Sequence, residues 1–179
     1  MLLLISGSLR KESFNTKLLH LIAGVYGGES QFADLNFPLF NEDLEAELDG
    51  VPPEVQKLSD QIKGADAVVI ASPEYNKNMT GVLKNALDWV SRTKGGPWKG
   101  KPVALVGASP NREGAARSMH SLVLAIKPFQ PRLITGPELQ VALADKEFAS
   151  DGSLPNERYM ATIQALVDNI KAEVARDAS

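Results

Sequence analysis

The chain has 179 residues, a formal net charge of -3 and no cysteine, which suits one α/β domain with a single hydrophobic core. The mild charge, without a basic stretch that alternates with aromatic residues, argues against nucleic-acid or membrane binding. The lack of cysteine excludes disulfides, thiolate catalysis and thiolate metal sites, so any redox chemistry requires a bound cofactor.

The chain opens on an apolar run at residues 1–5. A signal peptide needs an apolar region of roughly 7–15 residues and a membrane helix needs about 20, so this run is too short for either. We interpret it as a buried first strand and expect a soluble, cytoplasmic protein. The two histidines lie far apart in the sequence, and we expect no metal site.

Apolar runs of strand length alternate with segments of helical periodicity along the whole chain. The runs predict strands at residues 2–5, 31–35, 67–71, 103–106 and within 132–141. Helical spacing of apolar residues predicts helices at residues 15–26, 52–63, 80–92, 114–126 and 156–175, and residues 36–50 predict a long loop. Five strands with intervening helices predict a doubly wound parallel sheet with helices on both faces, in one domain over residues 1–179.

In such sheets a ligand lies beyond the carboxyl ends of the strands, so the loops after the first, third and fourth strands are the informative ones. The first loop is rich in small polar residues and leads into a helix, whose free N–H groups and positive dipole end attract phosphate. Its donors are Ser8, Arg10, Ser13, Asn15 and Thr16. An ordinary N-capped helix explains the same residues equally well.

This first loop matches neither of two known phosphate loops. A Walker A loop needs Gly-Lys followed by Ser or Thr, which is missing, and a dinucleotide loop needs three glycines, of which only Gly7 is present. A hydroxyl-rich loop suits a terminal phosphate, which has more oxygens to satisfy than a bridging pyrophosphate.

The loop after the third strand begins Ser72-Pro73-Glu74-Tyr75-Asn76. Pro73 stiffens the turn, Tyr75 could pack against a flat heterocycle and Asn76 could hydrogen-bond its edge. A polar turn before a helix is the alternative, and taken locally it is the more common case.

Both loops together resemble the NADPH-dependent FMN reductase family, which includes bacterial chromate and quinone reductases and several azoreductases. Gly7-Ser8-Leu9-Arg10 with Ser13 and Asn15 is similar to its phosphate loop. Pro73-Glu74-Tyr75-Asn76, followed by Gly81, Leu83-Lys84-Asn85 and Asp88-Trp89, is similar to its second signature. The motifs lie in register with the predicted strands, and the resemblance covers essentially the whole chain.

The resemblance implies a flavodoxin-like fold and noncovalent FMN. It implies that the phosphate is held by Ser8, Arg10, Ser13, Asn15 and Thr16, and the isoalloxazine ring by Pro73, Glu74, Tyr75 and Asn76. A third loop, with Ser109 and Gly114, would close the other side of the flavin. Family members often carry extra glycine there; Asn111 tolerates a left-handed backbone, so we expect the loop shape to survive.

The implied reaction passes a hydride from NADPH or NADH to flavin N5 and then reduces a small acceptor, such as a quinone, azo compound, chromate, ferric complex or free flavin. The flavin carries the chemistry, so no catalytic side chain is expected. Arg10, Lys11 and Arg112 could favour the 2′-phosphate of NADPH, but the choice of donor stays open.

The resemblance also implies a homodimer or homotetramer. The interface candidates are Phe37, Leu39, Phe40 and the helix with Asp88 and Trp89, although these aromatic residues could equally cover the core. Two other functions remain possible. A flavodoxin-type FMN electron carrier is usually more acidic than this chain, and a flavin-free binding or regulatory module can share the fold.

Overall fold

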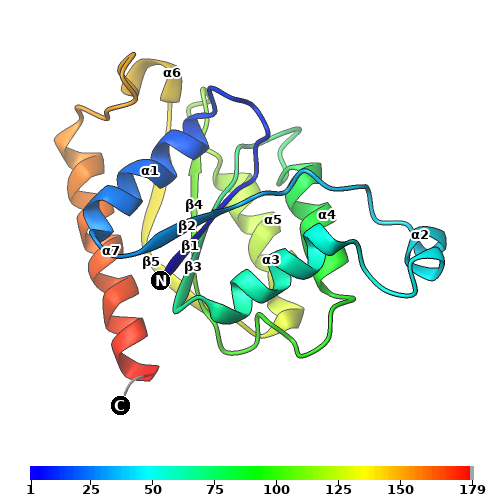
Figure 1. The fold of residues 1–179 in the computed structure, drawn as a ribbon. Helices are drawn as coiled ribbons and strands as arrows, with labels where there is room; N and C mark the ends of the chain where they lie inside the picture. Colours follow the sequence, from blue (N-terminus) through cyan, green and yellow to red (C-terminus); the bar gives the residue numbers. More distant parts are fainter. Residues whose placement is uncertain (178–179) are drawn as a thin grey trace.

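A computed structural model describes residues 1–177 of the chain and shows a five-stranded sheet in which every paired strand is parallel (Figure 1). The strand order is β2-β1-β3-β4-β5. This order is typical of the flavodoxin-like doubly wound fold, so the predicted fold class is confirmed. The strands are β1 (Leu2–Ser6), β2 (Ser30–Ala33), β3 (Ala67–Ala71), β4 (Pro102–Ala108) and β5 (Arg132–Val141).

Helices cover both faces of the sheet. Two pack on one face, α1 (Phe14–Tyr26) and α7 (Glu157–Asp177), and three pack on the other, α3 (Pro53–Gly64), α4 (Gly81–Val90) and α5 (Ala116–Ile126). Three short helical segments complete the described chain: α2 (Glu42–Glu47), η1 (Lys127–Phe129) and α6 (Ala144–Glu147). Within residues 1–177, no helix is both long and apolar enough to cross a membrane.

The first strand shows why the inner strands are apolar without alternation. Leu2 and Leu4 face the layer of α1 and α7, while Leu3 and Ile5 face the layer of α3, α4 and α5. Successive side chains of a strand point to opposite faces, and here both faces are covered. A strand in the middle of this sheet therefore has to be apolar at every position.

Four helices begin one or two residues later than predicted, and for α4 and α5 the local reason is visible. The Thr80 hydroxyl accepts a hydrogen bond from the backbone N–H of Leu83 at 3.3 Å, so Thr80 is the N-cap of α4 and Gly81 its first residue. Gly114 and Ala115 have positive φ angles of 57° and 74°, which no α-helix accommodates, so α5 begins at Ala116.

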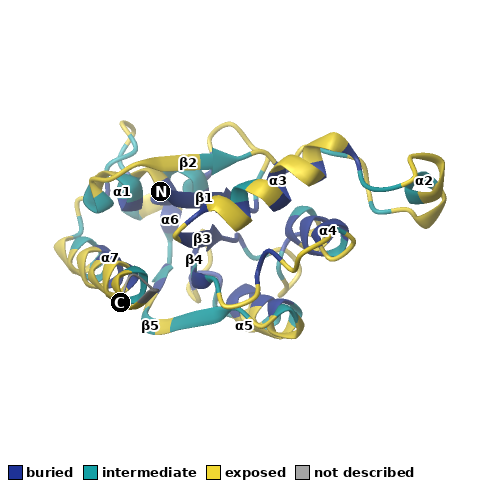
Figure 2. Cartoon of the chain, turned by 60° about the horizontal axis from the view of Figure 1, so that its bottom comes forward, coloured by how far each residue is buried: buried dark blue, intermediate teal, exposed yellow. Residues whose placement is uncertain are grey.

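The segment at residues 36–50, which we call the arm, is not a simple loop as predicted. It contains α2, which has no buried residue and projects away from the sheet (Figure 2). Its near end is fixed to α4: Asn85 Oδ1 accepts from Phe40 N at 2.7 Å, and Trp89 Nε1 donates to the Pro38 carbonyl at 2.8 Å. A six-residue helix without an apolar face leaves no periodic pattern to recognise.

Candidate functional site

The loops after β1, β3 and β4 lie at the same edge of the sheet because the carboxyl ends of parallel strands meet there. Backbone contacts join them. Gly7 N donates to the Ala71 carbonyl at 2.7 Å, the Thr80 hydroxyl donates to the Gly7 carbonyl at 2.7 Å, and Ser72 N donates to Val106 O at 3.0 Å. The loops after β1 and β3 are therefore joined to each other, and the second of them also to β4; with the loop after β4 at the same edge, they form what we call the rim.

The first loop passes close to α4 at Gly7. A Cβ atom on this residue would lie 2.6 Å from Leu83 Cδ1, closer than side chains approach in folded proteins. The close approach is what lets the Gly7 carbonyl reach the Thr80 hydroxyl in the neighbouring loop. The glycine of the first motif thus serves packing between the two loops.

Hydroxyl groups gather where the first loop enters α1. Ser13 is the N-cap and accepts from Thr16 N at 3.3 Å, and the Thr16 hydroxyl is hydrogen-bonded to Ser6 Oγ at 2.8 Å. Ser8 Oγ accepts from Arg10 N at 3.3 Å. Sequence reasoning missed Ser6, and its only sequence signal is a hydroxyl residue at the last position of a buried strand.

Positive charge predominates at this helix start. Arg10 is exposed, donates to the Glu12 carbonyl at 2.6 Å and lies over the Phe14 ring, 5.4 Å from its centroid. The one carboxylate, Glu12, pairs with Lys17 at 2.9 Å, and the Lys17 ammonium lowers the pKa of Glu12 by hydrogen bonding and by charge. With Lys11 also exposed, the segment offers cations and free helix N–H groups to an anion.

The Asn15 side chain reaches the carboxyl end of β4 instead of lying free in the first loop. Its side chain is 2% exposed. Asn15 Nδ2 donates to the Ala108 carbonyl and Oδ1 accepts from Ala108 N, both at 2.9 Å. These contacts fasten the first turn of α1 to the carboxyl end of β4, a role that no local sequence pattern reveals.

The loop after β3 carries a tight hairpin. Tyr75 and Asn78 exchange two backbone hydrogen bonds of 3.0 and 3.1 Å around Asn76 and Lys77, whose φ angles are 51° and 63°. Two left-handed residues at the tip are typical of a type I′ turn. Tyr75 is 55% exposed beside this turn, whereas Pro73 is buried at the end of the strand.

The Glu74 side chain points inward, unlike its neighbours at the hairpin. It is 3% exposed, and Oε2 accepts from the backbone N–H of Arg117 at 3.0 Å. The Arg117 guanidinium lies 3.4 Å from Oε1. The carboxylate is therefore occupied within the protein, and only the backbone of this residue is left to contact a ligand.

The loop after β4 is shaped by buried backbone contacts. Ser109 is buried, its N–H donates to Val141 O at 3.0 Å, and its hydroxyl accepts from Asn111 N at 3.2 Å. Gly114 is left-handed and packed so that a Cβ would lie 2.9 Å from the Gln140 carbonyl. The left-handed positions are thus Gly114 and Ala115, and Asn111 is not among them.

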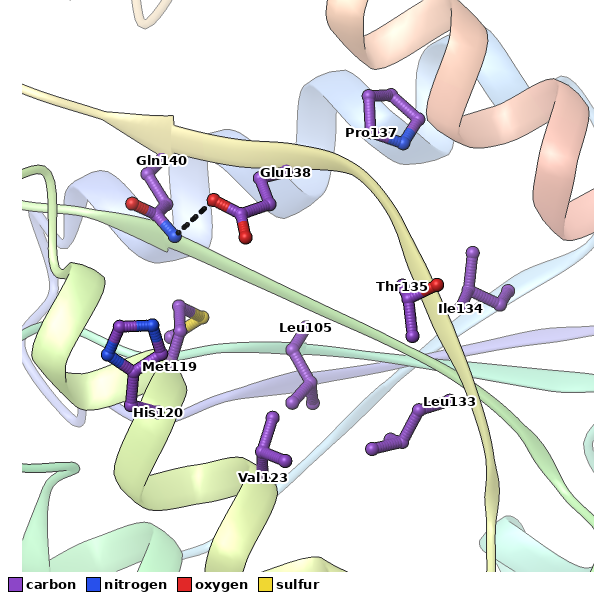
Figure 3. A pocket seen from close by; sticks show the side chains of 10 residues that line it. All are labelled: Leu105, Met119, His120, Val123, Leu133, Ile134, Thr135, Pro137, Glu138 and Gln140. Carbon is purple, nitrogen blue, oxygen red and sulfur yellow. Dashed lines mark hydrogen bonds between the residues drawn. The ribbon is translucent and has the colours of Figure 1, made fainter.

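A separate hollow lies between β5 and α5 (Figure 3). It is mostly apolar, with His120 on the helix and Thr135, Glu138 and Gln140 on the strand as its polar side chains. None of the eleven predicted site residues lines it. The candidate site is therefore the rim of three loops and not this hollow.

The role of Asn15 can be tested by changing one atom of its side chain. Asn15→Asp leaves the Ala108 carbonyl without a donor and places a carboxylate against it, so we expect a loss of about 1–3 kcal/mol in the free energy of unfolding. Urea unfolding measures it. Asn41→Asp is the matched control, because Asn41 Oδ1 only accepts, from Asp43 N at 2.9 Å, and a carboxylate accepts equally well. Equal stability of the two variants would contradict the role given to Asn15.

Comparison with known proteins identifies the family of the chain. The family described as NADPH-dependent FMN reductase matches residues 1–147. An NAD(P)H-dependent FMN reductase of Pseudomonas aeruginosa is 38% identical over 175 residues, which is 96% of this chain and 94% of the relative. A 2-hydroxy-1,4-benzoquinone reductase of a Burkholderia species is 34% identical over 173 residues, 94% of this chain and 92% of the relative.

The solved structure of FerB, a flavoenzyme NAD(P)H:(acceptor) oxidoreductase from Paracoccus denitrificans, superposes with a TM-score of 0.87 at 33% identity. The superposition covers 98% of this chain and 97% of FerB. These matches confirm the predicted resemblance and favour a reductase over a flavodoxin-type electron carrier. The chain belongs to the NADPH-dependent FMN reductase family, as an oxidoreductase that uses FMN and NAD(P)H.

Proposed function

We propose that the rim of three loops binds FMN, with the phosphate at the start of α1 and the ring between the loops after β3 and β4. The arrangement fits this group chemically. The first loop supplies hydroxyls, cations and helix N–H groups, as a dianionic phosphate requires, and the loop after β3 supplies an exposed aromatic side chain and a turn with accessible backbone. Residues 1–179 would form one FMN-binding domain.

The phosphate would be held by Ser8, Arg10, Ser13 and Thr16, all at the entrance to α1. Asn15 takes another part in this proposal. Because both polar groups of its side chain serve Ala108, it sets the position of the helix start relative to the third loop. The phosphate site would depend on Asn15 through that position.

The ring would be lined by Pro73, Tyr75 and Asn76 and by the Glu74 backbone on one side. Ser109 and Gly114 would line the other side. The observation that carries this assignment is that the first two loops are hydrogen-bonded to each other, while Asn15 and Glu74 join them to the carboxyl end of β4 and to the start of α5. A preformed rim holds a rigid heterocycle without first having to be ordered.

When bound, FMN would supply the redox chemistry, accepting a hydride from NAD(P)H at N5 and donating the electrons to a small acceptor. The chain's own residues orient the ring and limit the access of water, and the proposal assigns no covalent role to a side chain. A quinone is the acceptor we favour, because the Burkholderia relative is named as a benzoquinone reductase. Use of NAD(P)H also leads us to propose a cytoplasmic location.

An anaerobic titration tests the proposed reaction. We expect the protein loaded with FMN to lose its flavin absorbance on addition of NADPH or NADH and to regain it within seconds on addition of a quinone. The visible spectrum follows both steps. FMN that binds but is bleached by neither donor would favour an electron carrier, and failure to bind FMN would overturn the assignment of the loops.

The phosphate assignment predicts a difference between two flavins. Arg10→Ala removes a cation from the phosphate loop, so we expect FMN to bind roughly tenfold more weakly while riboflavin, which has no phosphate, binds unchanged. Fluorescence titration gives both dissociation constants. Lys11→Ala is the control, since it removes the neighbouring exposed charge. An equal loss for both flavins, or an equal effect of the two variants, would contradict the role of Arg10.

We further propose that the chain forms a homodimer or homotetramer through the arm. Leu39 is 77% exposed there. Three other candidates already have partners within the chain. Trp89 is fully buried, and Phe40 packs edge-on against it with ring centroids 5.0 Å apart. Asp88 forms an ion pair with Lys84. Leu39 is thus the candidate that a second copy could cover.

The oligomer is tested by mass measurement in solution, with size-exclusion chromatography and light scattering. Leu39→Glu places a charge at the proposed contact, so we expect a lower mass than that of the unmodified protein. Leu124→Glu, at a position that is 73% exposed on α5, is the control. Dissociation by Leu124→Glu alone would place the interface beside the hollow between β5 and α5, and a monomeric unmodified protein would refute the oligomer.

A further inference from the structure

Three hydrogen bonds join the loop after β3 to α5. Ser118 Oγ donates to Ser72 Oγ at 2.7 Å, and both residues are fully buried. Met79 N donates to Ser121 Oγ at 2.9 Å, which fixes the other end of the loop. Between them, the Glu74 carboxylate accepts from the backbone N–H of Arg117. The loop therefore takes its position from the first turns of this helix.

The contact of Glu74 completes the start of α5. The residue before the helix, Ala115, is left-handed and makes no side-chain cap. The first N–H groups of a helix need acceptors, and its N-terminus carries positive partial charge that stabilises a carboxylate. A cap normally comes from the residue just before the helix. Here the cap is the Glu74 side chain, which comes from another loop. Because this side chain is nearly completely buried, its carboxylate depends on the contact with α5 and not on hydrogen bonds to water.

The same side chain determines how the hairpin is presented. Glu74 is drawn into the protein, while Tyr75, the next residue, is half exposed at the hairpin beside Asn76. The capped end of α5 follows directly on Gly114 and Ala115, which end the loop after β4. The cap therefore also links the loop after β3 to the loop after β4. Both segments lie where the ring is proposed to bind.

We propose that Glu74 is a positioning residue, whose buried carboxylate caps α5 and thereby fixes the two loops that enclose the flavin ring. This inference rests on the proposed function, since the ring site is part of it. It gives the glutamate of the Pro73-Glu74-Tyr75-Asn76 motif a role for its side chain. It also accounts for a buried carboxylate directly before the exposed hairpin residues 75–78.

The test compares Glu74→Gln and Glu74→Ala with Glu113→Gln. Glu113 also pairs with Arg117, at 3.5 Å, but it is half exposed and caps nothing, so it controls for the loss of charge beside that arginine. We expect Glu74→Ala to weaken FMN and riboflavin by the same factor of roughly ten, because the ring and not the phosphate site is disturbed. Glu74→Gln keeps an acceptor atom and should lose less, with Glu113→Gln unchanged.

The absorbance and circular dichroism of the bound flavin provide a second measurement, because a displaced loop changes the surroundings of the ring. We expect shifted bands for both Glu74 variants. A lower melting temperature with unchanged bands and unchanged affinities would show that the cap serves stability alone, which overturns the proposal. An effect on FMN but not on riboflavin would overturn it as well.

Failure of the proposed function can be told apart from failure of this inference. If the unmodified protein binds neither flavin, the proposed function fails. Hydrogen exchange of the amides at residues 72–79 then still tests the cap. We expect faster exchange there in Glu74→Ala than in Glu113→Gln, and equal exchange in the two variants would overturn the positioning role.

Discussion

The parallel pairing of the strands around β1 is the constraint on which the rest of the structure depends. Leu2 is in register with Ser30 on one side and with Ala67 on the other, so the chain leaves β1 toward one neighbour and later returns to the opposite edge. The connections that begin at such a point diverge and leave a crevice at the carboxyl ends of the strands. The inner strands must be apolar because helices cover both faces of the sheet. Polar residues therefore gather in the loops that line this crevice.

Buried polar contacts then join the loops at the crevice. The Thr80 hydroxyl donates to the Gly7 carbonyl, and the Asn15 side chain donates to the Ala108 carbonyl. The Glu74 carboxylate accepts from a backbone N–H at the start of α5. Each contact satisfies a group that would otherwise be buried without a partner, and leaving such a group unsatisfied costs about 1–3 kcal/mol. The loops therefore have little freedom to move independently, and a ligand that touches one of them is sensitive to the other two.

The rim exposes apolar side chains where a flat ligand would be reached from solvent. Leu9 and Tyr75 follow the ends of β1 and β3, and they are two of the six large apolar residues exposed in residues 1–177. Exposed apolar surface of this kind commonly marks a binding site. It suits a flavin face that accepts different small acceptors by stacking and selects weakly among them.

Local patterns were sufficient for the strands, the long helices and the parallel sheet, because burial on both faces leaves unbroken apolar runs and amphipathic helices leave a periodicity. The residue types of Ser8, Ser13 and Tyr75 led to the proposal of a phosphate loop and a ring-lining loop, since hydroxyls, helix starts and aromatic rings act through local chemistry. The tertiary structure alone decided which side chains hold the loops together. Asn15 and Glu74 could equally have pointed toward a ligand, but their partners, Ala108 and Arg117, lie 93 and 43 residues away in the sequence. No local pattern encodes such a contact, because folding across the sheet is what brings the partners within hydrogen-bond distance.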